Sequence, residues 1–132
     1  MDLKILEIAS NTENNKVLDN FTHKSKNKNP ICGDEMEISL MVKNDTVVDI
    51  GYQCKSCVYC QASVSLLSQK IKNKKLEEIK QFITSCENIF ENTKTLLEKN
   101  WKDFLELFHK KNISRKECLL LPLRTVLKAL KI

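Results

Sequence analysis

Apolar side chains alternate with polar ones over residues 35–42 and again over residues 48–52, and the polar turn Lys-Asn-Asp separates the two runs. This period of two is typical of half-buried strands, and the turn residues favour an antiparallel hairpin. The alternation assigns one set of apolar residues to the core face of the hairpin: Met36, Ile38, Leu40, Val42, Val48, Ile50 and Tyr52. A small sheet built on this hairpin is therefore the first expectation for the fold.

The apolar spacing becomes helical in the second half of the chain. Residues 62–71, 76–90 and 96–108 and a last segment through Leu130 repeat apolar side chains every three or four positions, which predicts amphipathic helices. No internal repeat or linker interrupts this pattern. We predict one α+β domain over residues 1–132, with a small antiparallel sheet packed against four to five helices.

The first 28 residues carry a weaker pattern. Apolar residues between positions 3 and 8 predict a short N-terminal helix. Residues 11–29 contain six asparagines and four lysines but few apolar residues. We therefore expect residues 1–28 to form a helix followed by a mobile lead-in, with a loop before Pro30.

The cysteine content and the charge restrict the function. No apolar run reaches the roughly 20 residues of a membrane span, and the N-terminus does not resemble a signal peptide, so we expect a cytoplasmic protein with no membrane partner. In a reducing compartment, six cysteines favour metal or sulfur chemistry over disulfides. The net charge of +5 is spread widely and is not interleaved with aromatic residues, which favours a solvated basic surface over a nucleic-acid site. A weak bias towards acidic protein partners remains.

Three short stretches carry the candidate site: Asn-Pro-Ile-Cys-Gly-Asp at 29–34, Cys57 within Cys-Lys-Ser-Cys-Val-Tyr-Cys, and Cys118 near the C-terminus. They supply three thiols and one carboxylate, the set of ligands that a zinc ion or an iron–sulfur cluster needs. Gly33 allows the tight turn that points both neighbouring side chains at one ion.

Cys57 and Cys118 are each expected where a helix begins. A thiol at a helix N-terminus faces unpaired amides and the positive end of the helix dipole, and both favour the thiolate. Pro122 supports the placement of Cys118, because proline is tolerated in the first turn of a helix.

These motifs resemble the NifU/IscU/SufU family of iron–sulfur assembly scaffolds. The resemblance rests on residues 29–34, on Cys57 followed by Gln-Ala-Ser-Val-Ser, and on Arg115 three residues before Cys118, and it covers roughly residues 29–130. The long interval between Cys57 and Cys118 is most similar to the SufU-type branch.

The resemblance implies a set of ligands, a resting cofactor and partners. Cys32, Asp34, Cys57 and Cys118 would hold zinc or a labile [2Fe–2S] cluster at one shared site. Cys118 or Cys57 would accept sulfur from a pyridoxal-phosphate cysteine desulfurase, and sulfur or a nascent cluster would pass to apo-proteins. No small-molecule active site is evident, so the chain is expected to be a scaffold and at most a sulfur acceptor of the sulfurtransferase type. An oxygen ligand suits iron less than sulfur does, so Asp34 would make a bound cluster easier to release.

The chain departs from the family pattern around Cys57 and Cys118. Cys54 and Ser56 replace two glycines that usually precede Cys57, and Cys60 replaces a serine. Cys54 and Cys60 are therefore either accessory thiols or chance replacements. Glu117 stands where the IscU branch has a histidine, and the chaperone motif of that branch is absent.

Two other functions compete with the scaffold. The spacing Cys54-x2-Cys57-x2-Cys60 matches part of a bacterial ferredoxin motif, although the fourth cysteine is missing. This motif favours a ferredoxin-like electron carrier that uses Cys54, Cys57 and Cys60. A structural zinc module that binds nucleic acid through the net positive charge is the other alternative.

The remaining conspicuous residues are expected to be structural. Cys86 lies on an apolar helix stripe and should belong to the core. His23 and His109 stand among lysines and should be solvated, and Arg115 is either a surface residue or a group that helps Cys118 or a partner. The core should also include this group from the helical segment 96–108: Trp101, Phe104, Leu105 and Phe108.

Overall fold

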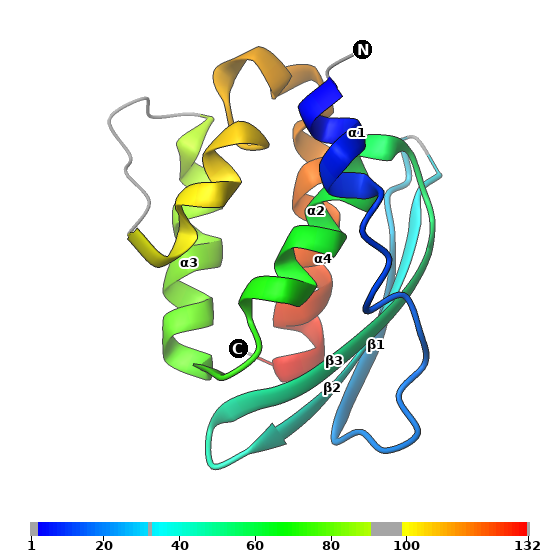
Figure 1. The fold of residues 1–132 in the computed structure, drawn as a ribbon, viewed down its shortest axis with the longest axis vertical. Coiled ribbons are helices and arrows are strands. Elements are labelled where there is room, and N and C mark those ends of the chain that lie inside the picture. The colour runs from blue at the N-terminus through cyan, green and yellow to red at the C-terminus, as the bar shows by residue number, and fades with distance from the viewer. Residues whose placement is uncertain (1–2, 32, 91–98, 132) are drawn as a thin grey trace.

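The computed structural model describes residues 3–31, 33–90 and 99–131. Four antiparallel strands form one sheet in the order β1-β2-β3-β4, and helices cover one of its faces (Figure 1). The strands are β1 (His23–Lys28), β2 (Glu35–Lys43), β3 (Thr46–Lys55) and the two-residue β4 (Lys74–Lys75). The predicted α+β class is confirmed.

The helical elements follow the predicted spacing closely. Their bounds are α1 (Leu3–Ala9), α2 (Val58–Lys70), α3 (Leu76–Ile89), the 3-10 helices η1 (Lys99–Glu106) and η2 (Lys110–Arg115), and α4 (Lys116–Leu130). Helix α4 contacts β1 and β2, while α2 contacts β3 and lies between α1 and α4. Among the described helices, none is long and apolar enough to cross a bilayer.

The β2–β3 hairpin forms where the alternation predicts it. Lys43 pairs with Thr46 across a two-residue loop, and Asn44 and Asp45 both have positive φ, at 52° and 59°. Asparagine and aspartate tolerate this conformation, which matches the twist of the flanking strands. A register shift near Met41 puts Val47 in the core and leaves Val48 37% exposed, so the predicted core position of Val48 is wrong.

Strand β1 replaces the loop that we expected before Pro30. Its sequence, His-Lys-Ser-Lys-Asn-Lys, contains no apolar residue, so it carries no hydrophobic alternation. The strand is held by pairing with β2 and by polar contacts with α4: the Ser25 hydroxyl donates to the Thr125 carbonyl at 2.7 Å, and Lys128 Nζ donates to the Lys26 carbonyl at 2.8 Å. These contacts depend on tertiary neighbours, which the local pattern does not reveal.

Asn14 fixes the segment that precedes β1. Its side chain is 2% exposed, donates to Ser68 Oγ and accepts from Lys72 Nζ, while its carbonyl accepts from the backbone N–H of Tyr52. The segment then crosses Gly51 so closely that a Cβ on Gly51 would lie 2.4 Å from the Lys16 carbonyl oxygen. A glycine at position 51 is therefore required by the close approach of the backbone.

The core lies between the helices and the covered face of the sheet. Phe82 stacks on Trp101 with ring centroids 4.0 Å apart, and Phe104 packs against Phe82 at 4.6 Å. Phe108 is buried as predicted, but Leu105 is 44% exposed, so its predicted core position is wrong; Leu107 is fully buried instead. The apolar positions predicted at 96 and 97 lie outside the described residues.

Candidate metal centre

Three of the four predicted ligands converge where two helices begin beside the β1–β2 loop. One ligand atom each from Asp34, Cys57 and Cys118 lies within 4.8 Å of the other two, the only such group of metal-ligating side chains among the described residues. Cys57 is the N-cap residue of α2, and Cys118 lies in the first turn of α4. Cys32, the fourth predicted ligand, lies outside the described residues.

The loop between β1 and β2 positions Asp34. The backbone N–H of Asn29 donates to the Asp34 carbonyl, and the N–H of Gly33 donates to the Asn29 carbonyl, both at 2.8 Å. The Asn29 side chain also accepts from the N–H of Ile31. Gly33 has φ of +78°, so the predicted need for glycine is met by its left-handed backbone. We did not predict the role of Asn29, although it opens the motif that contains the first ligand.

The two oxygens of the Asp34 carboxylate have different surroundings. Oδ1 accepts a hydrogen bond of 3.2 Å from the backbone N–H of Cys57. Oδ2 is buried and has no hydrogen-bond partner among the described residues, and the whole side chain is 7% exposed. Burial of an unpartnered polar oxygen is costly, and a cation bound at this oxygen would remove that cost. Oδ2 and the two thiols therefore fit a cation that prefers sulfur and oxygen ligands.

Side-chain contacts hold the starts of α2 and α4 together. The Arg115 guanidinium lies 5.4 Å from the centre of the Tyr59 ring, which joins the residue before α4 to the first turn of α2 by a cation–π interaction. The Ser63 hydroxyl donates to the Leu119 carbonyl at 2.7 Å, one residue beyond Cys118. Cys57 and Cys118 therefore stand on two helices that are fastened to each other near the thiols.

Glu117 has a structural partner. Arg124 donates to Glu87 of α3 at 3.0 Å and also forms an ion pair with Glu117. Glu117, which replaces the IscU-type histidine, is therefore linked to Glu87 of α3 through Arg124 of α4.

Pro122 is not where we predicted it. Helix α4 begins at Lys116, so Pro122 lies inside the helix and beyond its first turn. It has no N–H to donate to the carbonyl of Cys118, which is four residues earlier. The buried residues on either side of Pro122 pack the helix in place despite that loss.

Cys54 and Cys60 do not join the group of three ligands. Cys60 is fully buried in α2, and Cys54 is half-buried at the end of β3. Burial raises the pKa of both thiols, with the charge of Asp34 adding to the rise and Ser56 opposing it. Both cysteines therefore favour the neutral thiol, which is a poor nucleophile and a poor ligand.

Cys86, the two histidines and Arg115 lie outside the group of three ligands. Cys86 is fully buried, as predicted, and burial raises its pKa. His109 is exposed and caps η2 by accepting from the N–H of Lys111, while His23 is only partly exposed. Arg115 is exposed, and its proposed effects on Cys118 or on a partner remain predictions.

Comparison with known proteins supports the sequence resemblance. The model of the NifU-like N-terminal domain matches residues 2–102, more than half of the chain. This chain belongs to the NifU-like N-terminal domain family. It is 31% identical over 128 residues to the iron–sulfur cluster assembly scaffold protein IscU of Thermotoga maritima, a match that covers 96% of this chain and 89% of that protein. The predicted family is confirmed.

Two further proteins match this chain over part of its length or in fold. The zinc-dependent sulfurtransferase SufU of Bacillus subtilis is 32% identical over 73 residues, which cover 55% of this chain and 49% of that protein. The crystal structure of a putative iron–sulfur assembly scaffold protein for the SUF system from Fervidobacterium islandicum superposes with a TM-score of 0.90 at 24% identity, covering 98% of this chain and 96% of that one. This second likeness shows that the fold is shared.

Proposed function

We propose that this chain is an iron–sulfur assembly scaffold or zinc-bound sulfur acceptor that takes sulfur from a cysteine desulfurase and passes sulfur or a nascent cluster to apo-proteins. The observation that carries the proposal is the convergence of ligand atoms from Asp34, Cys57 and Cys118, together with the buried, unpartnered Oδ2 of Asp34 in the described part of the chain. The family supports it, because one relative is named a cluster assembly scaffold and another a zinc-dependent sulfurtransferase.

We assign the ligand set to Cys32, Asp34, Cys57 and Cys118. A bound zinc ion would keep the thiols deprotonated at neutral pH. The chain itself contributes two helix N-termini, whose amides and dipoles favour thiolate at Cys57 and Cys118. The carboxylate of Asp34 supplies the oxygen ligand, and the hydrogen bond from the Cys57 N–H orients it.

Sulfur acceptance requires one exchange at a thiolate. The sulfur of Cys57 or Cys118 forms a bond to the terminal sulfur of the donor's persulfide, the S–S bond of the donor breaks, and the donor leaves as a thiolate. Cys57 is half-buried, whereas Cys118 is only 5% exposed, so Cys57 is the more accessible of the two cysteines. Iron and sulfur are then the substrates that assemble between the ligands, and a cluster is the cargo.

The grouping of thiols argues against the ferredoxin-like alternative. An electron carrier would need Cys54, Cys57 and Cys60 to face one cluster, but of these only Cys57 belongs to the ligand group in the described part of the chain. The nucleic-acid alternative gains no support either. A basic groove on the uncovered face of the sheet includes Lys28, Glu35 and Lys55, and the described residues that line it include no aromatic side chain on which a base could stack.

The proposal is tested by loading and transfer under anaerobic conditions. The chain is incubated with a cysteine desulfurase, cysteine and ferrous iron, and both the visible absorption and persulfide formation (by mass spectrometry) are followed. We expect either a cluster chromophore that moves to an apo-ferredoxin or a persulfide on Cys57 or Cys118. Failure to obtain either product would contradict the proposed function.

Asp34→Ala tests the role of the carboxylate in release. We expect a cluster on this variant to pass to apo-ferredoxin several-fold more slowly, because carboxylate oxygen suits iron less than thiolate sulfur does and the variant lacks the ligand that detaches most easily when an acceptor thiolate arrives. Asp19→Ala, which removes an exposed aspartate remote from the ligand group, should transfer at the parent rate. An unchanged rate in Asp34→Ala would exclude a role of this carboxylate in release.

A further inference from the structure

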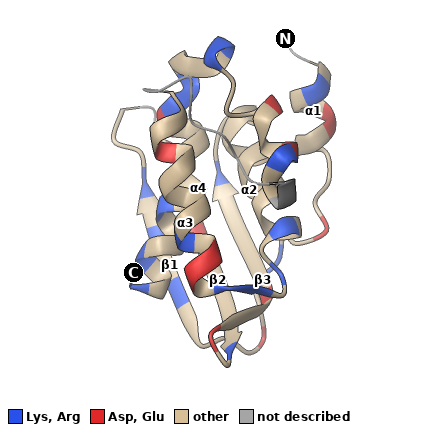
Figure 2. Cartoon of the chain, turned by 90° about the vertical axis from the view of Figure 1, so that its left-hand side faces the viewer, with Lys and Arg blue, Asp and Glu red and all other residues tan. Residues whose placement is uncertain are grey.

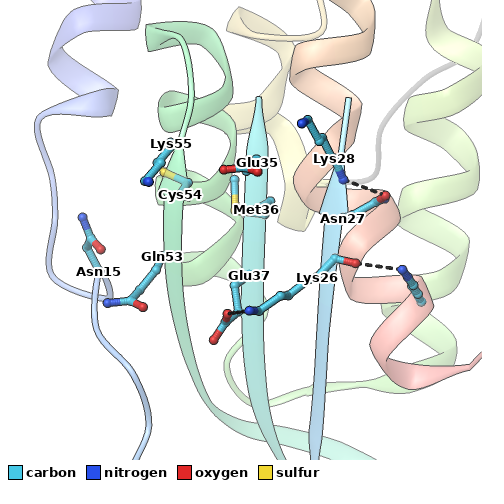
Figure 3. Close-up of a pocket in the computed structure, with 11 residues that line it drawn as sticks. Asn15, Lys26, Asn27, Lys28, Glu35, Met36, Glu37, Gln53, Cys54 and Lys55 are labelled. Atoms are coloured by element: carbon cyan, nitrogen blue, oxygen red, sulfur yellow. Dashed lines mark hydrogen bonds and ion pairs between the residues drawn. The ribbon is translucent and has the colours of Figure 1, made fainter. Parts of the chain in front are cut away.

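A groove on the uncovered face of the sheet leads to the end of the molecule that carries the ligand group. Its volume is about 760 Å³, and strands β1, β2 and β3 form its floor (Figure 3). Glu35, at the groove's upper end, directly follows Asp34, and Cys54 and Lys55 lie three and two residues before Cys57. An occupant of the groove would therefore lie beside the candidate metal centre.

The charge of the groove is mainly basic. Four of its lining side chains are lysines, namely Lys26, Lys28, Lys55 and Lys128, and only two are acidic. Lysines occupy every second position of β1, which carries blue segments in Figure 2. Because successive side chains of a strand point to opposite faces, these exposed lysines share the uncovered face of the sheet. This arrangement gathers a positive field over a concave surface, which attracts acidic partners.

The two glutamates of the groove differ in their pairing. Glu37 forms ion pairs with Lys24 at 3.1 Å and with Lys26 at 3.3 Å, and the hydrogen bond from Lys24 is the main cause of its lowered pKa. Glu35, Lys28 and Lys55 are exposed and form no ion pair within the described part of the chain. The unpaired cations therefore lie at the upper end of the groove, nearest the ligand group.

The polar groups of the groove suit a polypeptide better than a nucleic acid. Asn15, Asn27 and Gln53 line it, and their amides can both donate to and accept from an extended backbone. Among the described residues that line the groove none is aromatic, so they provide no surface on which bases could stack.

We propose that this groove docks an extended acidic segment of a protein partner, which Lys28 and Lys55 hold beside the candidate metal centre. This docking surface rests on the proposed function only for its biological purpose. We expect the acidic segment to bind whether or not the chain accepts sulfur. It adds to that function a place and a chemistry for partner recognition.

The test is an NMR titration of the ¹⁵N-labelled full chain with an oligoglutamate peptide at low ionic strength. We expect shifts concentrated at the backbone amides of residues 24–28, 35–37 and 53–55. The double variant Lys28→Glu/Lys55→Glu should bind about tenfold more weakly, since it removes two exposed ion pairs with the peptide and adds repulsion at both positions. Equal shifts at Lys80 of α3 would overturn the proposal.

A matched double variant distinguishes peptide binding in the groove from general attraction by the net positive charge. Lys80→Glu/Lys102→Glu changes the charge equally at two exposed lysines on α3 and η1, and it should bind oligoglutamate nearly as well as the parent. Equal weakening in both double variants would overturn the proposal, as would tighter binding of oligothymidylate in the groove. The metal content of each sample is measured in parallel: weak peptide binding with intact metal refutes only the docking surface, whereas lost metal binding in the parent refutes the proposed function.

Discussion

Substitution of Cys118 by alanine is expected to lower the affinity of the chain for zinc by at least about 100-fold, since even residues that only support a ligand commonly contribute about 10–100-fold. The Cys118 thiol lies within 4.8 Å of the other two ligand atoms, in the first turn of a helix whose dipole favours thiolate. Its removal leaves Asp34 Oδ2 and Cys57 without the third described ligand. The measurement is competition for zinc against a chromogenic chelator at neutral pH.

Cys86→Ala is the matched control for this experiment. It removes the same chemical group from a buried helical position, but Cys86 belongs to the core between α3 and its neighbours and lies outside the ligand group. We expect its zinc affinity to equal that of the parent chain. Equal loss in both variants would mean that altered folding explains the result, and unchanged affinity in Cys118→Ala would remove Cys118 from the ligand set.

Phe82→Ala is expected to lower the free energy of unfolding by about 3–5 kcal/mol, the usual cost of removing a buried phenyl ring. Phe82 is 3% exposed and contacts both Trp101 and Phe104, so its loss leaves a cavity between α3 and η1. The measurement is equilibrium unfolding in urea at a fixed zinc concentration, because bound metal itself stabilises the folded state.

Leu105→Ala provides the contrast within the same segment. Leu105 is 44% exposed, so we expect a change below about 1 kcal/mol. If the two variants lost similar stability, the stacked aromatic cluster would not be the main packing contact between α3 and η1.

The hairpin and the long helices were predictable because each carries a complete local signal. Alternation fixed the core face of β2, and the pair Asn44-Asp45 provided the turn that its positive φ angles require. The polar strand β1 carried no such signal, since its stability comes from β2 and from two hydrogen bonds to α4. The displacement of Val48 arose from a register shift that no periodic pattern encodes.

Helix α2 shows how tertiary context changes an amphipathic pattern. Its apolar stripe predicted one buried face, but Ser63, Ser65 and Ser68 are buried as well because α1 and α4 cover the other sides. Each of these hydroxyls donates to a carbonyl, at Leu119, Asn11 and Ser65 respectively. Serine is polar in composition yet small enough for close helix packing, so the sequence alone did not identify α2 as the central helix.

The candidate site was predictable from ligand chemistry and family resemblance. Asp34, Cys57 and Cys118 are far apart in sequence, and the residues alone offered several cysteine groupings. The structure brings these three together and leaves Cys54 and Cys60 outside the group. The role of Cys32 remains a prediction, as does the identity of the bound metal.

X-ray absorption spectroscopy of the zinc-loaded chain tests the central claim most directly. We predict a first shell dominated by sulfur at about 2.3 Å with an oxygen contribution at about 2.0–2.2 Å, the distances typical of thiolate and carboxylate ligands. Cys118→Ala loaded at high zinc should show fewer sulfur neighbours than the parent. A shell composed only of nitrogen and oxygen in the parent chain would contradict the claim that Asp34, Cys57 and Cys118 form a metal centre.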